Sequence, residues 1–245
     1  MQPQTTIGTS ANRATLGWHP PLAPQSAPAA APDFKSIDAI GTVTLAARDQ
    51  EIYAEGEAAP FCYRVVAGAV RTLKLLPDGR RQILEFHLPG DLLGFDDDET
   101  RYLSAEAACD TTLIRYARRH VETLAATDAG LARKLRDLAA AKLRACRKQI
   151  LLLGRMSAQE RIATFLLDVA DRAPRDQDGT IGLMMSRSDI ADHLGLTLET
   201  VSRVLHRLHR DGLIKLVSAH RVGLADRDAL DEMAGRAPAV VPRHD

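Results

Sequence analysis

The 245-residue sequence contains only three cysteines, Cys62, Cys109 and Cys146, and they are scattered along the chain. An odd number of scattered thiols is not typical of a disulfide framework, and it indicates a reducing compartment. None of the three belongs to a C-x-x-C pair, and an iron–sulfur cluster needs a fourth thiolate. We therefore expect no metal and no cofactor. Cys62 and Cys146 are either small buried apolar side chains or redox sensors, and the sequence leaves both open.

Long apolar runs and net charge are also missing. No run approaches the roughly 20 residues that span a bilayer, and the N-terminus has no basic-then-apolar signal pattern. We therefore expect a cytoplasmic protein that does not bind membranes. Lys and Arg number 32, as do Asp and Glu, so binding to nucleic acid would depend on local charge asymmetry. Residues 131–155 show such asymmetry, with eight Lys or Arg against Asp137 alone.

Signatures of common catalytic sites are absent as well. The sequence has no H-E-x-x-H, no phosphate-binding G-x-x-x-x-G-K-[ST], no G-x-S-x-G and no G-x-G-x-x-G. Residues 37–117 lack the clustered His and carboxylate ligands that a metalloenzyme with a small β-roll would need. We therefore expect no enzyme. An enzyme-like roll fused to a DNA-binding module is the alternative from a different class, and metal analysis of the purified protein separates the two.

The most informative pattern is a pair of short helices around Gly195. Ser186, with Asp189 three residues later, has the form of a capping box at the start of the first helix. Gly195 permits the tight turn after it. Thr197 can cap a second helix, which we expect from Leu198 to about Arg210. A helix-turn-helix followed by the strands of a wing is the predicted motif.

The second of these helices is amphipathic, with Val201, Leu205 and Leu208 at helical spacing on one face. The opposite face of its N-terminal half is the part of a helix-turn-helix that enters the major groove. Arg binds guanine through two hydrogen bonds, Glu accepts from cytosine, and Ser contacts thymine or a phosphate. A solvated surface helix would show a similar polar face, but the capped helix and turn before it favour DNA. The residues predicted to contact bases are Glu199, Ser202 and Arg203. The residues predicted to contact the DNA backbone or to assist are Ser186, Arg187, Thr197, Thr200, His206 and Arg207.

The run LGLTLETVSRVLHRL, residues 194–208, resembles the recognition signature of the Crp/Fnr family, specifically its Fnr/FixK branch. The resemblance covers roughly residues 35 to 232. It implies a homodimer that binds double-stranded operator DNA with palindromic TTGAT half-sites, where Arg203 and Glu199 contact a G·C pair. It also implies an activator that recruits RNA polymerase, commonly at genes for microaerobic respiration, nitrogen fixation or denitrification. FixK-like members lack the iron–sulfur cluster of other members, and the N-terminal segment here has no cysteine.

The N-terminal half predicts a small antiparallel β-roll. Short β-rich segments are separated by turn residues, and Pro77-Asp78-Gly79 predicts a hairpin. The strand candidates are residues 51–53, 61–66, 68–76, 81–87 and 111–117. The expected fold class is α+β, with this cyclic-nucleotide-binding-like roll, a long dimerisation helix and a C-terminal winged helix-turn-helix. The expected boundaries are a disordered tail at 1–34, the roll at 35–127, the dimer helix at 128–155, the winged helix at 156–235 and a tail at 236–245, with a separate core in each domain.

The effector of the roll is not identified by its residues. Relatives that bind cyclic AMP grip its phosphate with an Arg, and here Glu99 occupies that position and would repel the phosphate. Gly94, Phe95 and Asp96 instead resemble the Fnr-branch loop that contacts RNA polymerase. A regulator that senses a small ligand, haem or nitric oxide remains the alternative within the family. Either His87 or His120 could serve as an axial haem ligand.

The longest helical pattern runs from about Asp128 to Arg155 and carries two adjacent stripes. One stripe would suffice to pack the helix onto the roll, so two predict pairing with a second copy in a parallel coiled coil. A core helix with one broad buried face is the alternative. We assign the first stripe to the dimer interface: Leu131, Leu135, Leu138, Lys142, Ala145, Gln149 and Leu152. The second stripe comprises Ala139, Leu143, Cys146, Ile150 and Leu153.

Overall fold

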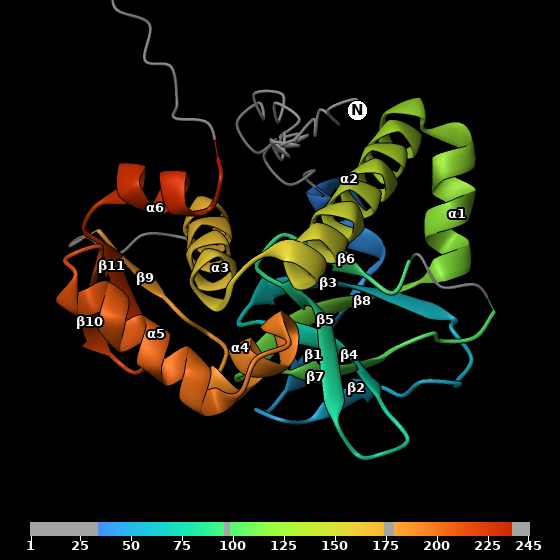
Figure 1. The fold of residues 1–245 in the computed structure, drawn as a ribbon. Helices are drawn as coiled ribbons and strands as arrows, with labels where there is room; N and C mark the ends of the chain where they lie inside the picture. Colours follow the sequence, from blue (N-terminus) through green and yellow to red (C-terminus); the bar gives the residue numbers. More distant parts are fainter. Residues whose placement is uncertain (1–33, 96–98, 174–178, 237–245) are drawn as a thin grey trace, which may run out of the picture.

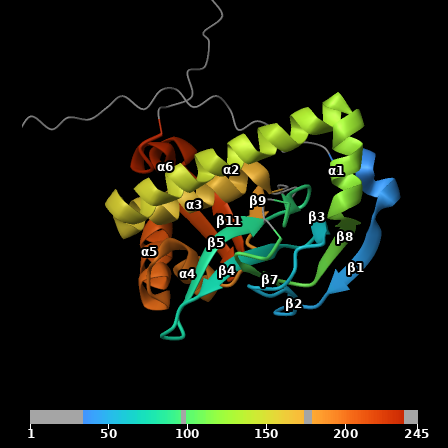
Figure 2. The same ribbon diagram turned by 90° about the vertical axis from the view of Figure 1, so that its right-hand side faces the viewer.

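The computed structural model describes residues 34–95, 99–173 and 179–236 (Figure 1). A β-roll and a winged helix lie side by side, and one long helix runs above both of them (Figure 2). The tails expected at 1–34 and 236–245 lie outside the described residues, apart from Phe34 and Arg236. Phe34, the first described residue, is only 1% exposed and belongs to a buried cluster of the roll.

The roll consists of two antiparallel sheets. Their strand orders are β1-β8-β3-β6 and β2-β7-β4-β5. The interior lies between them: Val65 on β3 and Leu113 on β8 pair side by side in the first sheet, and both belong to one buried cluster with Val70 and Ala105 of the second sheet. The predicted strands are confirmed, whereas β1, β6 and β7 were not predicted. The bounds are β1 Thr42–Ala46, β2 Glu51–Tyr53, β3 Phe61–Ala67, β4 Val70–Leu75, β5 Arg81–His87, β6 Leu92–Leu93, β7 Ser104–Ala107 and β8 Thr111–Ala117.

The helical part begins where β8 ends. Helix α1 follows β8 directly and was not predicted; its buried Val121 joins the cluster beneath α2. Strand β9 completes a three-stranded wing sheet of order β10-β11-β9. The bounds are η1 Lys35–Ile40, α1 Arg118–Thr127, α2 Ala129–Arg155, α3 Ala158–Arg172, β9 Thr180–Gly182, α4 Arg187–Leu194, α5 Leu198–Arg210, β10 Ile214–Ser218, β11 Arg221–Leu224 and α6 Arg227–Met233.

Helix α2 places the first predicted stripe on its inward face. Leu131 and Leu152 are each only 3% exposed within the protomer. Leu135 and Leu138 pack against the buried cluster that joins α2 to the roll. These leucines therefore make contacts inside the protomer, and their assignment to the dimer interface stays a prediction.

The polar members of that stripe also serve contacts within the chain. Lys142 Nζ lies 3.8 Å from a carboxylate oxygen of Glu85 on β5. Gln149 Nε2 donates to the backbone carbonyl of His193 on α4 at 3.0 Å. Ala145 is exposed. The first stripe thus fixes α2 to its own roll and winged helix.

The second stripe is the outward one. Leu143 is 53% exposed and Ile150 is 71% exposed, which is unusual for large apolar side chains. Ala139 and Cys146 are exposed between them, and only Leu153 packs into the protomer. An apolar stripe of alternating three- and four-residue spacing is therefore uncovered on the surface.

The largest buried cluster joins the two domains. It combines Ile83 and Phe86 of β5 with Phe165 of α3 and Leu205 of α5. The rings of Phe86 and Phe165 meet edge to face, with centroids 6.2 Å apart. The winged helix therefore shares its core with the β4–β5 hairpin, whereas the roll also has a separate buried cluster around Val65, Leu93 and Leu113.

The turn between β3 and β4 gives a test of the fold. Gly68 has a φ of 82°, and a Cβ there would lie 2.5 Å from both the carbonyl oxygen of Asp110 and the hydroxyl of Thr111. Gly79 has a φ of 83° but no atom within 4 Å of its Cβ position. Gly79→Ala should cost about 1 kcal/mol of unfolding free energy, from backbone conformation alone. Gly68→Ala should cost roughly 3 kcal/mol, because the clash is added. Urea denaturation measures both, and equal costs would contradict the crowding at Gly68.

Candidate DNA-binding interface

The helix-turn-helix forms as its capping residues predict. The Ser186 hydroxyl accepts from the Asp189 backbone N–H at 3.1 Å, and the Asp189 carboxylate accepts from the Ser186 N–H at 3.0 Å. Gly195 follows α4 in the left-handed region, with a φ of 60°. The Thr197 hydroxyl then accepts from the backbone N–H of Thr200 at 3.2 Å and begins α5. These caps satisfy backbone donors that would otherwise be left unpaired at the helix starts.

Helix α5 separates into a buried and an exposed face. Val201 and Leu208 are fully buried and Leu205 is 2% exposed, so this face anchors the helix in the shared core. Glu199 and Arg203 are exposed on the other side. The helix runs along the outer edge of the molecule, with α4 between it and the roll (Figure 1). The predicted base-contacting face is therefore accessible.

The exposed side chains of α5 are arranged by short-range contacts. An Arg203 guanidinium N–H donates to the Thr200 hydroxyl at 3.3 Å, and Arg187 from α4 lies 3.5 Å from the Ser202 hydroxyl. Hydrogen bonds from its own backbone N–H and from the Thr197 hydroxyl hold the pKa of Glu199 below its usual range. The carboxylate is thus an acceptor at neutral pH, as a contact with cytosine requires.

A basic hollow continues along α5 from the predicted base contacts. Its lining residues are Ser202, Arg203, His206, Arg207 and Arg210. The ring Nδ1 of His206 lies 2.8 Å from the carbonyl of Ser202, so the Nε2 edge faces outward. Arg210 was not among the predicted contacts, because it lies in the last turn, beyond the half of the helix that usually meets bases. The hollow offers positive charge to a phosphate chain.

Two of the residues predicted to contact the DNA backbone already have hydrogen-bond partners within the protein. The hydroxyl of Ser186 donates to Asp189 at 2.8 Å, and that of Thr197 donates to Thr200 at 3.0 Å. Arg207 lies 3.6 Å from Asp211 in an exposed pair that water screens. Contact between these residues and DNA stays a prediction.

The described residues on the effector side of the roll, which exclude 96–98, do not form the phosphate grip of cyclic-AMP-binding relatives. Glu99 is exposed and carries the wrong charge for a phosphate. Arg101 is 3% exposed, donates to the carbonyls of Gly94 and Phe61, and stacks 4.0 Å from the Tyr53 ring centroid. Its guanidinium is committed to the backbone and to an aromatic ring. The residues present do not fit a cyclic nucleotide held through its phosphate.

The candidate haem ligand His87 lies inside the protein. It is 1% exposed, and its Nε2 lies 3.3 Å from the Thr72 hydroxyl. Burial holds the pKa of His87 below its usual range, so the ring is neutral. A buried ring engaged in this way does not present its Nε2 to a haem iron.

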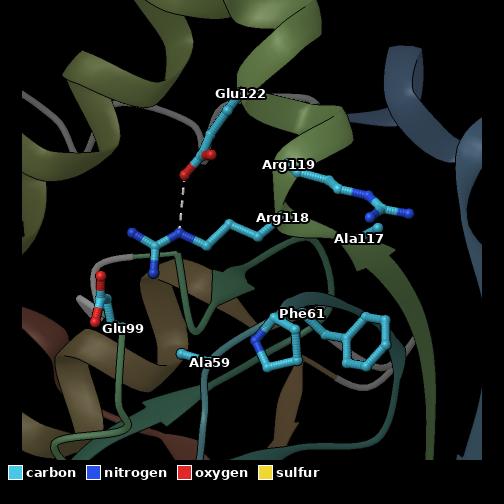
Figure 3. Close-up of a pocket in the computed structure, with 8 residues that line it drawn as sticks. Ala59, Phe61, Glu99, Ala117, Arg118, Arg119 and Glu122 are labelled. Atoms are coloured by element: carbon cyan, nitrogen blue, oxygen red, sulfur yellow. Dashed lines mark hydrogen bonds and ion pairs between the residues drawn. The ribbon is translucent and has the colours of Figure 1, made fainter.

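The predicted polymerase loop adjoins a hollow where α1 leaves β8 (Figure 3). Arg118 donates to Glu122 at 3.0 Å across this hollow, and its guanidinium lies 5.8 Å from the Phe95 ring centroid. Gly94 is buried, and Asp96 lies outside the described residues. Phe95 is therefore placed at the rim of a surface with mixed charge, and its contact with polymerase stays a prediction.

The thiols and other metal-binding side chains are dispersed. Cys62 is fully buried, and burial raises the pKa of its thiol to about 12, so it is a small core side chain and no reactive thiolate. Cys146 is exposed on α2. Among the described residues, no group of three or more His, Cys, Asp or Glu is placed to hold a metal ion. In the same part of the chain, no helix has the length and apolar character needed to cross a membrane.

Comparison with known proteins assigns both halves of the chain. A Crp-like helix-turn-helix domain model matches residues 160–233, and a cyclic nucleotide-binding domain model matches residues 44–128. The chain is 45% identical over 197 residues to the nitrogen fixation regulation protein FixK of Azorhizobium caulinodans, with 79% of each protein covered. It is 41% identical over 181 residues to FixK of Rhizobium meliloti, covering 74% of this chain and 82% of that protein.

A solved structure agrees with these relatives. The structure of FixK2 from Bradyrhizobium japonicum superposes with a TM-score of 0.77 at 45% identity, covering 81% of this chain and 99% of that one. Fold and site together define a transcription regulator with a winged helix-turn-helix. The chain belongs to the Crp/Fnr family, within its Fnr/FixK branch. The relatives are regulators, which confirms the expectation that the chain is not an enzyme.

The cap of α5 can be tested directly. Thr197→Ala removes the hydroxyl that accepts from the Thr200 N–H and should cost about 1 kcal/mol of unfolding free energy. Thr197→Ser keeps the hydroxyl and should remain within about 0.5 kcal/mol of the parent. Urea denaturation followed by far-UV circular dichroism measures both. Equal losses for the two variants would show that the methyl group, rather than the cap, supplies the stability.

Proposed function

We propose that this protein is a homodimeric activator that binds palindromic operators with TTGAT-type half-sites. The observation that carries the proposal is the exposed face of α5, where Glu199, Ser202 and Arg203 lie together on a helix anchored by buried residues. A guanidinium and an ionised carboxylate one helical turn apart match the donor and acceptor edges of a G·C pair. Two relatives are nitrogen fixation regulation proteins, which supports nitrogen fixation genes as targets.

The base-contact assignment predicts different outcomes for two arginines of one helix. Arg203→Ala should cost about 1–3 kcal/mol of binding free energy at an intact half-site and should relax discrimination at its G·C pair. Arg210→Ala removes the same charge from the far end of the hollow, so it should weaken all duplexes alike. Titration of matched and mismatched duplexes at fixed salt measures both. If Arg203→Ala also weakens all duplexes equally, Arg203 contacts a phosphate and the assignment fails.

A palindromic operator requires two recognition helices about 34 Å apart, which a dimer supplies. We propose the outward stripe of α2 as the seam, because it is apolar, exposed and spaced for a parallel coiled coil. Its central members are Ala139, Leu143, Cys146 and Ile150. The inward stripe connects α2 to both domains of its own protomer, so pairing along the outward stripe leaves those contacts intact.

The seam is tested with two leucines of one helix. Leu143 is 53% exposed on the outward stripe, and Leu151 is 57% exposed about a third of a turn away from it. Leu143→Glu would place two like charges against each other in the seam, so the protein should become monomeric and lose operator affinity. Leu151→Glu should remain dimeric and bind normally. Analytical ultracentrifugation and gel-shift titration on the same samples decide, and a dimeric Leu143→Glu variant would place the seam elsewhere.

The activator role requires a surface for RNA polymerase. We propose the loop that ends at Gly94 and Phe95, together with Asp96 beyond the described residues, as that surface. Phe95 is half-buried, and the Arg118 guanidinium lies 5.8 Å from its ring centroid, so part of the ring is open to a partner. Since the proposed ligand is chromosomal DNA, we also propose that the protein lies in the cytoplasm.

A further inference from the structure

Helix α4 of the DNA-binding domain is docked on strand β5 of the roll. Gln82 Nε2 donates to the carbonyl of Asp192 at 2.8 Å. The His193 ring nitrogen Nδ1 lies 3.1 Å from the carbonyl of Ile83, and the ring lies 5.2 Å from that of Phe86. The figure shows α4 between the roll and α5 (Figure 1). Any movement of α4 along β5 would therefore carry the recognition helix with it.

A buried arginine of the roll reaches this contact. Arg71 on β4 has a side chain only 5% exposed and contacts three carboxylates. Its guanidinium lies 3.0 Å from Asp189, 2.6 Å from Glu106 and 2.9 Å from Asp49. Glu106 and Asp49 belong to the roll, whereas Asp189 belongs to α4. The guanidinium thus joins strands of the effector domain to the first helix of the DNA-binding domain.

The carboxylate of Asp189 serves both sides of the contact. Its Oδ2 accepts from the N–H and the hydroxyl of Ser186, which caps α4. Its Oδ1 accepts from Arg71 at 3.0 Å and from Arg81 at 3.1 Å. Arg81 also bonds Asp192, one turn farther along α4, at 2.8 Å. The start of α4 is therefore fixed to the roll through directional hydrogen bonds as well as apolar packing.

We propose that Arg71 is a positioning residue for operator binding: through Asp189 it fixes the recognition helix relative to the roll, and so sets the spacing between half-sites that the dimer accepts. This inference rests on the proposed function. Apolar contacts alone would tolerate sliding of α4 along β5, whereas a planar guanidinium bonded to several carboxylates permits one arrangement. A buried ion pair contributes little net stability, so its effect is on the orientation of the docked helix.

The position of the recognition helix α5 relative to the roll affects DNA binding, because α5 is rigidly connected to α4. Helices α4 and α5 are joined by a three-residue turn, Gly195 to Thr197, and share one buried core. Helix α2 is fixed to the roll and, in the proposed dimer, to its copy. The Arg71–Asp189 contact therefore contributes to the distance between the two recognition helices, together with the bond from Gln149 of α2 to the His193 carbonyl of α4.

The test measures spacing preference. Palindromic duplexes with the preferred half-site spacing, and with one base pair more or fewer, are titrated with the full-length parent, Arg71→Gln and Arg80→Gln. Arg80 is an exposed arginine of the neighbouring hairpin tip that pairs only with Asp78 among the contacts of the described residues, so it is the matched control. Arg71→Gln should reduce the ratio of affinities between preferred and shifted spacing by about tenfold. Its affinity for a single half-site should stay within about twofold of the parent.

Arg71→Lys is measured in parallel, because Arg71→Gln removes the positive charge beside Asp189 and Glu106 and can destabilise the protein for that reason alone. Lysine keeps the charge and loses the planar fork, so the ratio should fall by about threefold while the protein stays folded. A ratio equal to that of the parent in the folded Arg71 variants would overturn the positioning role. If the Arg71 variants lose affinity equally at every spacing, and the loss parallels their loss of thermal stability, Arg71 has only a structural role. If the parent protein binds the palindromic duplexes no more tightly than a scrambled duplex, the proposed function itself is wrong.

Discussion

The docking of α4 on strand β5 is the contact on which the rest of the molecule depends. Ile83 and Phe86 of the roll belong to the same buried cluster as the residues that anchor α5. Arg71 and Arg81 add directional bonds to the start of α4. Two domains that differ in fold class therefore share one core, and the orientation of the recognition helix is a property of the roll as much as of the winged helix.

Helix α2 has one face that packs within the protomer and one apolar face that is exposed. The inward face packs against the roll near its start, through Leu131, and against the winged helix near its end, through Leu152. The outward face presents Leu143 and Ile150 to solvent. Because one rigid helix carries both faces, a contact between two copies would be transmitted to both domains without an intervening hinge.

The charges of the chain act locally, since the totals cancel. Arginines gather along the exposed side of α5, whereas two buried arginines of the roll have internal partners: Arg71 contacts carboxylates, and Arg101 contacts backbone carbonyls and the Tyr53 ring. These two guanidinium groups therefore stabilise the structure of the roll. We propose that the arginines of α5 contact DNA instead.

The sequence by itself determined the local structure: Ser186, Thr197 and Gly195 specify caps and a turn through bonds within a few residues. It also determined which face of α5 is polar, because helical spacing is a local property. Only the tertiary structure decided which stripe of α2 faces inward, since both stripes are apolar and the choice depends on the surfaces that pack against them. It alone joined Arg71 to Asp189, which are 118 residues apart, because no periodicity connects side chains brought together by the docking of two domains.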